Sequence, residues 1–190
     1  MRREITGFSN PLLKEIRGLR EKKLRKRAGL FLAEGLRIMT EAREAGFLPE
    51  MLFRVKDRPV HALEIALEDE VLRNGGDVIE TSADIMAKLS GKDNAQAVVG
   101  VYRDHGTALA DIERATAPIW LVAQAMRDPG NLGTMLRTGD AVGAGGLILI
   151  DDCTDPFSVE AVRASMGAIF TQKIVQCRWD EFITWLRAGD

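Results

Sequence analysis

The sequence predicts an α/β protein built from two small domains. Apolar runs of strand length alternate along the chain with segments whose apolar residues recur at helical spacing. A polar stretch over 104–117 interrupts this alternation. We therefore expect an N-terminal α/β domain over 1–103, a linker over 104–117 and a second, parallel-sheet domain over 118–190.

The first half of the chain carries clear signals for both element types. Asn10 before Pro11 places a capping side chain ahead of a proline, which is typical of a helix start. Further helices are expected over 38–45, 61–73 and 82–89. Strands are expected over 30–33, 51–55, 78–79 and 97–102.

The second half repeats the alternation. The run Gly146-Leu147-Ile148-Leu149-Ile150 has the continuous apolar composition of a buried parallel strand. Two more strands are expected, over 119–123 and 174–177. The expected helices run from about 131 to 142, from Ser158 to about Ala168, and over 180–186.

Composition excludes several classes of protein. The 46% apolar and 28% charged residues are those of an ordinary globular chain, and no apolar run reaches the length of about 18 residues that a membrane helix needs. The start lacks the apolar segment of a secretory signal. Cys153 and Cys177 are too few for a disulfide framework, so we expect a cytoplasmic location.

Known site patterns are also missing. His61 and His105 do not stand at metal-ligand spacing from a cysteine, so no metal site is predicted. The sequence has no phosphate-binding P-loop, no Gly-x-Gly-x-x-Gly fingerprint and no Gly-x-Ser-x-Gly elbow. Asp151 and Asp152 follow a strand and can bind a cation or a ribose, although such pairs more often end a strand in solvent.

Positive charge is concentrated near the N-terminus. Residues 1–30 contain ten Lys or Arg and three Glu, whereas the whole chain has a formal net charge of −2. A cluster of this kind can neutralise phosphates and predicts nucleic-acid binding, although a solvated helix face is the alternative. Few aromatic residues accompany it, so base stacking is not expected. The candidate RNA-binding residues are Lys22, Lys23, Arg25, Lys26 and Arg27.

The segment 127–138 is the most informative for chemistry, because it lies between a predicted strand and a predicted helix. We expect Asn131 to cap the helix and to point its amide into the crevice beyond the strand. Gly133 leaves room for another backbone or a ribose, and Arg137 follows it on nearly the same helical face. An arginine there can grip a phosphate. The alternative is structural: a cap, a packing glycine and a surface charge.

The wider context adds a family resemblance. Residues 127–145, together with 161–168 downstream, resemble the SpoU (TrmH-type) branch of the SPOUT RNA methyltransferases. The segments 31–35 and 90–100 are similar to the start and the closing turn and strand of that family's substrate-binding domain. Together these segments extend over nearly the whole chain.

The resemblance implies a methyl transfer from S-adenosylmethionine to a ribose 2′-hydroxyl of ribosomal or transfer RNA. It also implies an RNA-binding N-terminal domain, a C-terminal domain with a knotted tail that binds the cofactor, and a homodimer. Asn131 and Arg137 match the family's first motif, and Arg137 matches the arginine credited with activating the ribose hydroxyl. Because a guanidinium is almost never deprotonated, we expect Arg137 to orient the phosphate and stabilise alkoxide charge.

Other features of the family pattern are less complete. Arg163 and Ser165 stand on a helix that the family uses near the RNA, and a surface or packing role is equally compatible with the sequence. The second and third family motifs do not occur, so the cofactor-binding loops are expected beyond residue 190 and the chain is expected to be a fragment truncated before the knot. Such a fragment would bind cofactor weakly, be inactive by itself and self-associate through exposed apolar surface.

Two other functions remain open at this stage. The basic N-terminus and the small α/β domain are compatible with a non-catalytic RNA-binding module. A Rossmann-like nucleotide-binding protein with another chemistry is the third reading, and the missing phosphate fingerprint argues against it.

Overall fold

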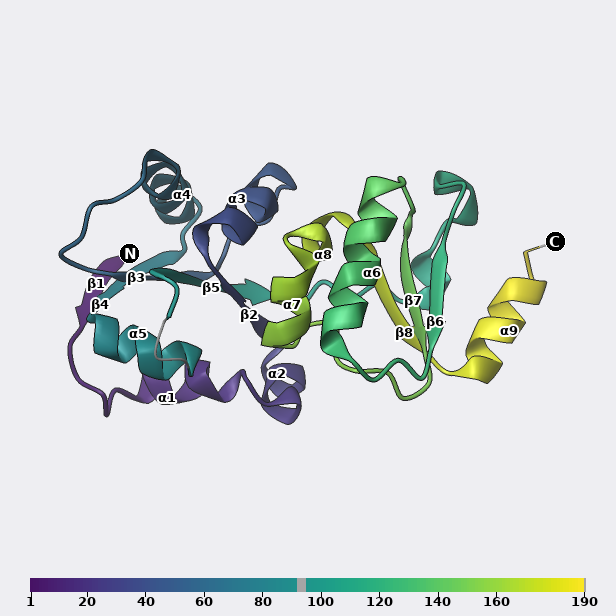
Figure 1. Ribbon diagram of the computed structural model, residues 1–190, viewed down its shortest axis with the longest axis horizontal. Coiled ribbons are helices and arrows are strands. Elements are labelled where there is room, and N and C mark those ends of the chain that lie inside the picture. The colour runs from purple at the N-terminus through teal and green to yellow at the C-terminus, as the bar shows by residue number, and fades with distance from the viewer. Residues whose placement is uncertain (92–94, 190) are drawn as a thin grey trace. The chain divides into compact units, whose positions relative to one another are not determined.

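The computed structural model of the chain describes residues 1–91 and 95–189 (Figure 1). Residues 92–94, part of the segment 90–100 that contributes to the family resemblance, lie outside the described residues. The chain divides into two compact units. The first is formed by Met1–Asp104 with Phe157–Val159, and the second by His105–Pro156 with Glu160–Asp190.

The first unit is built on a five-stranded mixed sheet. Its strands are β1 (Arg2–Ile5), β2 (Leu30–Glu34), β3 (Met51–Val55), β4 (Asp77–Thr81) and β5 (Val98–Arg103). The spatial order is β1-β4-β3-β5-β2. The neighbours β1, β4 and β3 pair in parallel, whereas β5 pairs antiparallel with both β3 and β2.

Helices cover both faces of this sheet, so the first unit has three layers (Figure 1). They are α1 (Pro11–Gly18), α2 (Lys22–Ala28), α3 (Leu36–Glu44), α4 (Ala62–Arg73) and α5 (Ala83–Ser90). α3 and α4 pack together on one face, and α1 and α5 pack together on the other. Between the sheet and the α1–α5 layer lies a core that includes Phe53, Ile79 and Val99, all fully buried.

The N-terminal strand β1 was not predicted from the sequence. Only Ile5 of its residues is buried, so the strand has no apolar run that would mark it. Its charges are instead used in pairing: Arg2 contacts Glu68 at 2.7 Å and Arg3 contacts Asp77 at 2.8 Å. The first two positive side-chain charges of the chain are therefore neutralised within the fold.

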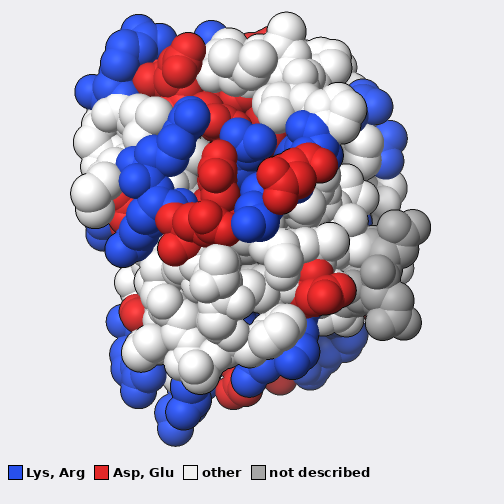
Figure 2. Space-filling view, turned by 90° about the vertical axis from the view of Figure 1, so that its left-hand side faces the viewer, with Lys and Arg blue, Asp and Glu red and all other residues white. Residues whose placement is uncertain are grey.

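A buried ionic network joins α4 to the sheet. Glu64 and Glu68 are only 2% and 3% exposed, whereas Leu63 of the same helix is exposed. The guanidinium of Arg54 on β3 lies 3.3 Å from Glu68 and 3.3 Å from Glu80. Arg58 pairs with Glu64. The guanidinium groups of Arg54 and Arg58 are therefore the reason that two carboxylates, rather than Leu63, face inward. Figure 2 shows basic and acidic side chains interleaved over this end of the first unit.

The second unit contains a three-stranded parallel sheet in the order β6-β7-β8. Its elements are β6 (Leu121–Gln124), α6 (Pro129–Ala141), β7 (Gly146–Ile150), α7 (Val159–Ser165), α8 (Ala168–Thr171), β8 (Lys173–Cys177) and α9 (Trp179–Arg187). α6 and α8 pack together against β7 and β8. A second cluster, which includes Ile148, Val175 and Phe182, lies between the sheet and α9.

The stretch predicted as a linker, 104–117, is packed onto the second unit from residue 105 onward. It forms two short 3-10 helices, Leu109–Asp111 and Arg114–Thr116, and Thr107 makes a β-bridge with Val175. Ile112 is buried in the same cluster as Phe182. The segment has no strand pattern, and its single buried apolar residue gave no periodic signal.

Within the described residues, no helix combines the length and the apolarity needed to cross a membrane.

The Glu68 carboxyl gives the first unit a distinctive pH dependence. Burial raises its pKa above the ordinary value of 4.5, an effect only partly opposed by the charges of Arg54 and Arg2. The folded state therefore holds the Glu68 proton more tightly than the unfolded state does. The free energy of unfolding falls as the pH rises from the ordinary pKa of the carboxyl through its raised pKa in the folded state. We expect the free energy of unfolding of the wild type to fall relative to that of Glu68→Gln as pH rises above 4.5.

Urea unfolding followed by circular dichroism across this pH range measures the difference. Glu15→Gln, at an exposed carboxyl of α1, is the control for general charge effects. A wild type that gains stability relative to Glu68→Gln as the pH rises would contradict the prediction.

Candidate active site and RNA interface

The site is built at the N-terminal half of α6, directly after β6. Asp128 caps this helix, because its Oδ1 accepts a hydrogen bond of 2.6 Å from the backbone N–H of Asn131. Pro129 occupies the first helical position. The prediction that Asn131 caps the helix is therefore wrong. The helix begins two residues earlier than predicted, because an Asp-Pro pair meets the cap requirement better.

Gly133 is a packing glycine. A Cβ added there would lie 2.4 Å from the Ala164 Cβ and 2.7 Å from the Ala161 carbonyl oxygen. α6 and α7 thus approach each other too closely for any side chain at this position. The cleared surface that the sequence suggested for a ribose is filled by the backbone of α7.

Asn131 and Arg137 lie on the solvent-exposed part of α6. Thr134 stands between them, three residues from each, and its hydroxyl donates to the Gly130 carbonyl at 2.9 Å. Within the described residues, Arg137 forms no ion pair or side-chain hydrogen bond. Its guanidinium is therefore available to bind a ligand, whereas Gly133 lies on the buried face of the same helix.

Polar groups near the carboxyl ends of β6, β7 and β8 form hydrogen bonds and an ion pair with one another. Asp151 accepts hydrogen bonds from the Gln124 side chain at 2.8 Å and from the Trp179 backbone N–H at 3.0 Å. Arg127 pairs with Asp152 at 2.6 Å. Both carboxylates are thus engaged, and these described residues leave no set of donors and acceptors aimed at S-adenosylmethionine.

The predicted RNA-binding cluster separates into two kinds of residue. Lys22, Lys23, Lys26 and Arg27 of α2 are exposed, and none of them forms an ion pair within the described residues. Arg25 is only 5% exposed, and its Nη1 donates to the carbonyl oxygens of Leu19 and Arg20 at 2.8 and 2.7 Å. Arg25 therefore holds the turn between α1 and α2 and cannot meet a phosphate, which corrects its assignment.

The two residues of α7 also differ. Arg163 is exposed, as an RNA contact requires. Ser165 is fully buried, and its hydroxyl donates to the Val162 carbonyl at 2.6 Å. Of the two readings of Ser165 that the sequence left open, the structure favours packing.

Comparison with known proteins identifies the family of both units. Residues 10–100 match the MRM3-like substrate binding domain, and residues 118–189 match the SpoU rRNA Methylase family. The AdoMet-bound rRNA methyltransferase from Sinorhizobium meliloti is 36% identical and has a TM-score of 0.89 over 99% of this chain and 69% of that one. The chain belongs to the SpoU family.

The names of two curated relatives of this SpoU chain describe them as methyltransferases of ribosomal RNA. The 23S rRNA (guanosine(2553)-2'-O)-methyltransferase RlmP of Bacillus subtilis is 28% identical over 98% of this chain and 70% of its own length. The mitochondrial rRNA methyltransferase 3 of Xenopus tropicalis is 30% identical over 90% of this chain. The chain spans 41% of the length of that relative.

The predicted family and the α/β fold are confirmed. The predicted cofactor agrees with the AdoMet bound to the Sinorhizobium meliloti relative. The comparisons do not favour a non-catalytic RNA-binding module or an unrelated nucleotide-binding protein. The roles of Asn131, Arg137, Arg163 and the α2 cations stay predictions.

The close contact of α6 with α7 leads to a stability prediction. Gly133→Ala forces the Ala164 backbone away and lowers the free energy of unfolding of the second unit by about 2 kcal/mol, even though alanine favours helices. All tryptophans of the chain, Trp120, Trp179 and Trp185, lie in this unit, so tryptophan fluorescence during urea unfolding reports on it.

The matched control for Gly133→Ala is Thr138→Ala, at an exposed position of the same helix. It should change the stability by less than about 0.5 kcal/mol. If both substitutions changed the free energy of unfolding equally, the contact between α6 and α7 would be looser than the structure shows.

Proposed function

We propose that this chain acts in the transfer of a methyl group from S-adenosylmethionine to a ribose 2′-hydroxyl of ribosomal or transfer RNA. Membership of the SpoU family supports the reaction class. At the level of residues, the proposal rests on the exposed guanidinium of Arg137, which has no ion-pair partner in the part of the chain that the structure describes. The helix that carries Arg137 is fixed in place by its close packing with α7.

Arg137 positions the nucleophile in this proposal. Its planar fork of N–H donors matches two phosphate oxygens, and so it can hold the target nucleotide by its backbone. As the 2′-hydroxyl loses its proton to water, the same positive charge stabilises the developing alkoxide. S-adenosylmethionine, when bound, supplies a sulfonium methyl group as the electrophile.

Asn131 lies exposed in the first turn of α6. Its side-chain amide can donate to a phosphate or ribose oxygen beside Arg137. Arg163, exposed on α7, adds a further positive charge for the RNA backbone. These roles rest on exposure and residue type together with the family motif.

The α2 cations and the family's substrate-binding domain support an RNA-binding role for the first unit. We further propose a homodimer that acts in the cytoplasm without a membrane partner. The family resemblance supports the dimer, and the reducing compartment fits the two free cysteines.

Removal of the Arg137 guanidinium tests the proposed mechanism. In a protein that carries this chain together with a complete methyltransferase domain, Arg137→Ala should lower the rate of methyl incorporation into ribosomal RNA at saturating substrates by about 10²- to 10³-fold, because a charge that stabilises the transition state is lost. Arg137→Lys should restore only part of the rate, since lysine keeps the charge but not the fork. The measurement is the transfer of a labelled methyl group.

Thr138→Ala, at the neighbouring exposed position of α6, serves as the activity control. A rate for Arg137→Ala within about twofold of wild type would remove Arg137 from the mechanism.

Neutralisation of the α2 cations tests the RNA interface. The triple variant Lys22→Gln, Lys23→Gln, Lys26→Gln should reduce the slope of log affinity against log salt by about 2, because each phosphate contact on a single strand contributes about 0.7. Fluorescence anisotropy with a labelled RNA at several salt concentrations measures this slope.

The control for the triple variant is Arg73→Gln, at an exposed cation of α4 on the opposite face of the sheet. A slope that is unchanged in the triple variant would show that α2 does not contact RNA.

A further inference from the structure

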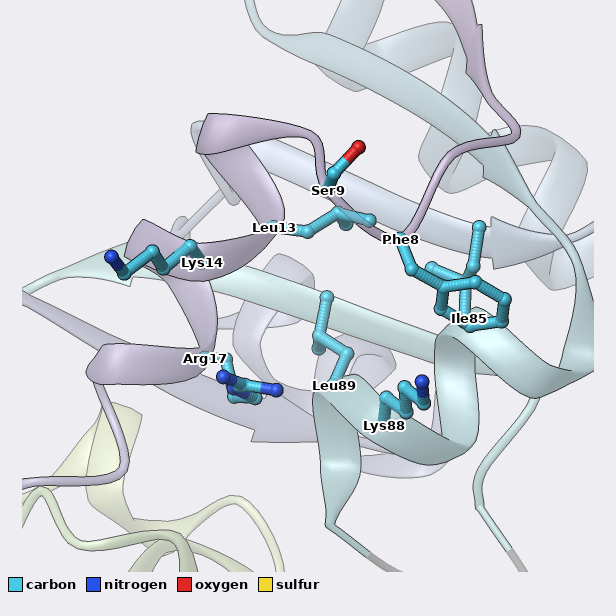
Figure 3. A pocket seen from close by; sticks show the side chains of 8 residues that line it. All are labelled: Phe8, Ser9, Leu13, Lys14, Arg17, Ile85, Lys88 and Leu89. Atoms are coloured by element: carbon cyan, nitrogen blue, oxygen red, sulfur yellow. The ribbon is translucent and has the colours of Figure 1, made fainter.

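A pocket opens between α1 and α5 in the first unit (Figure 3). Its floor is apolar: Leu13, Ile85 and Leu89 are buried. Phe8, just before α1, lies at its rim with 51% of its surface exposed. The full lining is Phe8, Ser9, Leu13, Lys14, Arg17, Ile85, Lys88 and Leu89.

Positive charge surrounds this apolar floor. Lys14 and Arg17 stand one turn apart on α1, and Lys88 comes from α5. The lining contains no carboxylate. Within the described residues, none of these cations forms an ion pair, and the Lys88 ammonium lies 3.9 Å from the centre of the Phe8 ring.

The nearest acidic residues along the same helices do not neutralise these cations. Glu15 and Asp84 are exposed on α1 and α5 and form no ion pair within the described residues. A pocket with an apolar floor, an exposed aromatic ring and an unneutralised basic rim is complementary to an aromatic ring that carries negative charge. A nucleotide has this combination.

The size of the pocket narrows the choice of ligand. Its volume of about 140 Å³ is below the roughly 300 Å³ at which drug-sized sites begin. A single planar base fits such a space, whereas a whole cofactor does not.

The pocket also borders a second hollow that reaches the basic surface of α2. Lys14 lines both this pocket and a second hollow between α1 and α2, to which Arg27 and the exposed Glu15 also contribute. A chain of phosphates can therefore pass from the α2 cations over Lys14 to Lys88. A single strand can follow this path while one of its bases enters the pocket.

We propose that the pocket between α1 and α5 binds one unpaired base of the RNA substrate, stacked against Phe8, with the adjoining phosphates on Lys14, Arg17 and Lys88. Stacking on an aromatic side chain beside a basic track is how proteins hold single-stranded RNA. The proposal rests on the RNA-binding function proposed above and adds to it a site for a single-stranded segment.

The test uses the whole chain and two fluorescent probes in anisotropy titrations. One probe is a mixed-sequence RNA strand of about 12 nucleotides, within the range of sites on single-strand binders. The other is a strand of the same length and charge in which every position is abasic. Phe8→Ala should weaken binding of the first probe about tenfold and leave the second unchanged.

Further variants separate stacking from charge and from folding. Phe8→Trp keeps a stacking surface and should retain the wild-type affinity. Ile65→Ala, at an apolar residue of α4 that is 50% exposed, is the matched control and should have no effect on either probe. Lys88→Gln should weaken both probes equally, because both carry phosphates.

Two results overturn the proposal alone: equal affinity of wild type and Phe8→Ala for the base-containing strand, or an equal loss on both strands. In those cases binding that still depends on the α2 lysines leaves the proposed function intact. A wild-type chain that binds neither probe contradicts both proposals. Thermal unfolding of each variant shows whether a lost affinity reflects a lost fold.

Discussion

The packing of α6 against α7 is the constraint on which the candidate active site depends. At Gly133 the backbones are so close that no side chain fits between them. This contact determines which residues of α6 are buried and which face solvent, so it orients Asn131 and Arg137 without touching either. Catalytic positioning of this kind needs rigidity more than it needs polar contacts around the arginine.

The charge of the first unit is divided by the fold into two populations. Arg2, Arg3 and Arg54 form ion pairs with carboxylates, and Arg25 donates hydrogen bonds to backbone carbonyl oxygens. Lys14, Arg17 and the exposed residues of α2 have no such partner within the described residues. The sequence places all but one of these cations within its first 30 residues, and only the structure shows which of them remain available to a phosphate.

Much of the architecture could be predicted from the sequence, because most elements carry strong apolar patterns. The strands β3 and β7 begin and end at the predicted residues, 51–55 and 146–150. β1 escaped prediction because its stability comes from ion pairs and from parallel pairing with β4, which pattern analysis does not register. The segment 104–117 was predicted as a linker for a related reason, since its packing depends on few apolar residues.

The candidate site was predictable only in part. The motif located Arg137 in the sequence, and the structure agrees that it is exposed. Helical spacing suggested that Gly133 shares its surface, but the tight contact with Ala161 and Ala164 is a tertiary effect. The base pocket was missed because its parts are far apart in sequence: a lone phenylalanine at position 8 gives no signal until α5 places Lys88 beside it.

The exposed cations of α1 and α2 have a consequence for the orientation in which RNA first binds. The chain as a whole carries a formal net charge of −2, so a polyanion is not attracted to it from a distance. At physiological ionic strength charges are screened beyond about 8 Å, and an approaching strand senses only the surface in front of it. Encounters at the basic surface are then prolonged and those elsewhere are brief. Such electrostatic steering selects the orientation of the complex before any specific contact has formed.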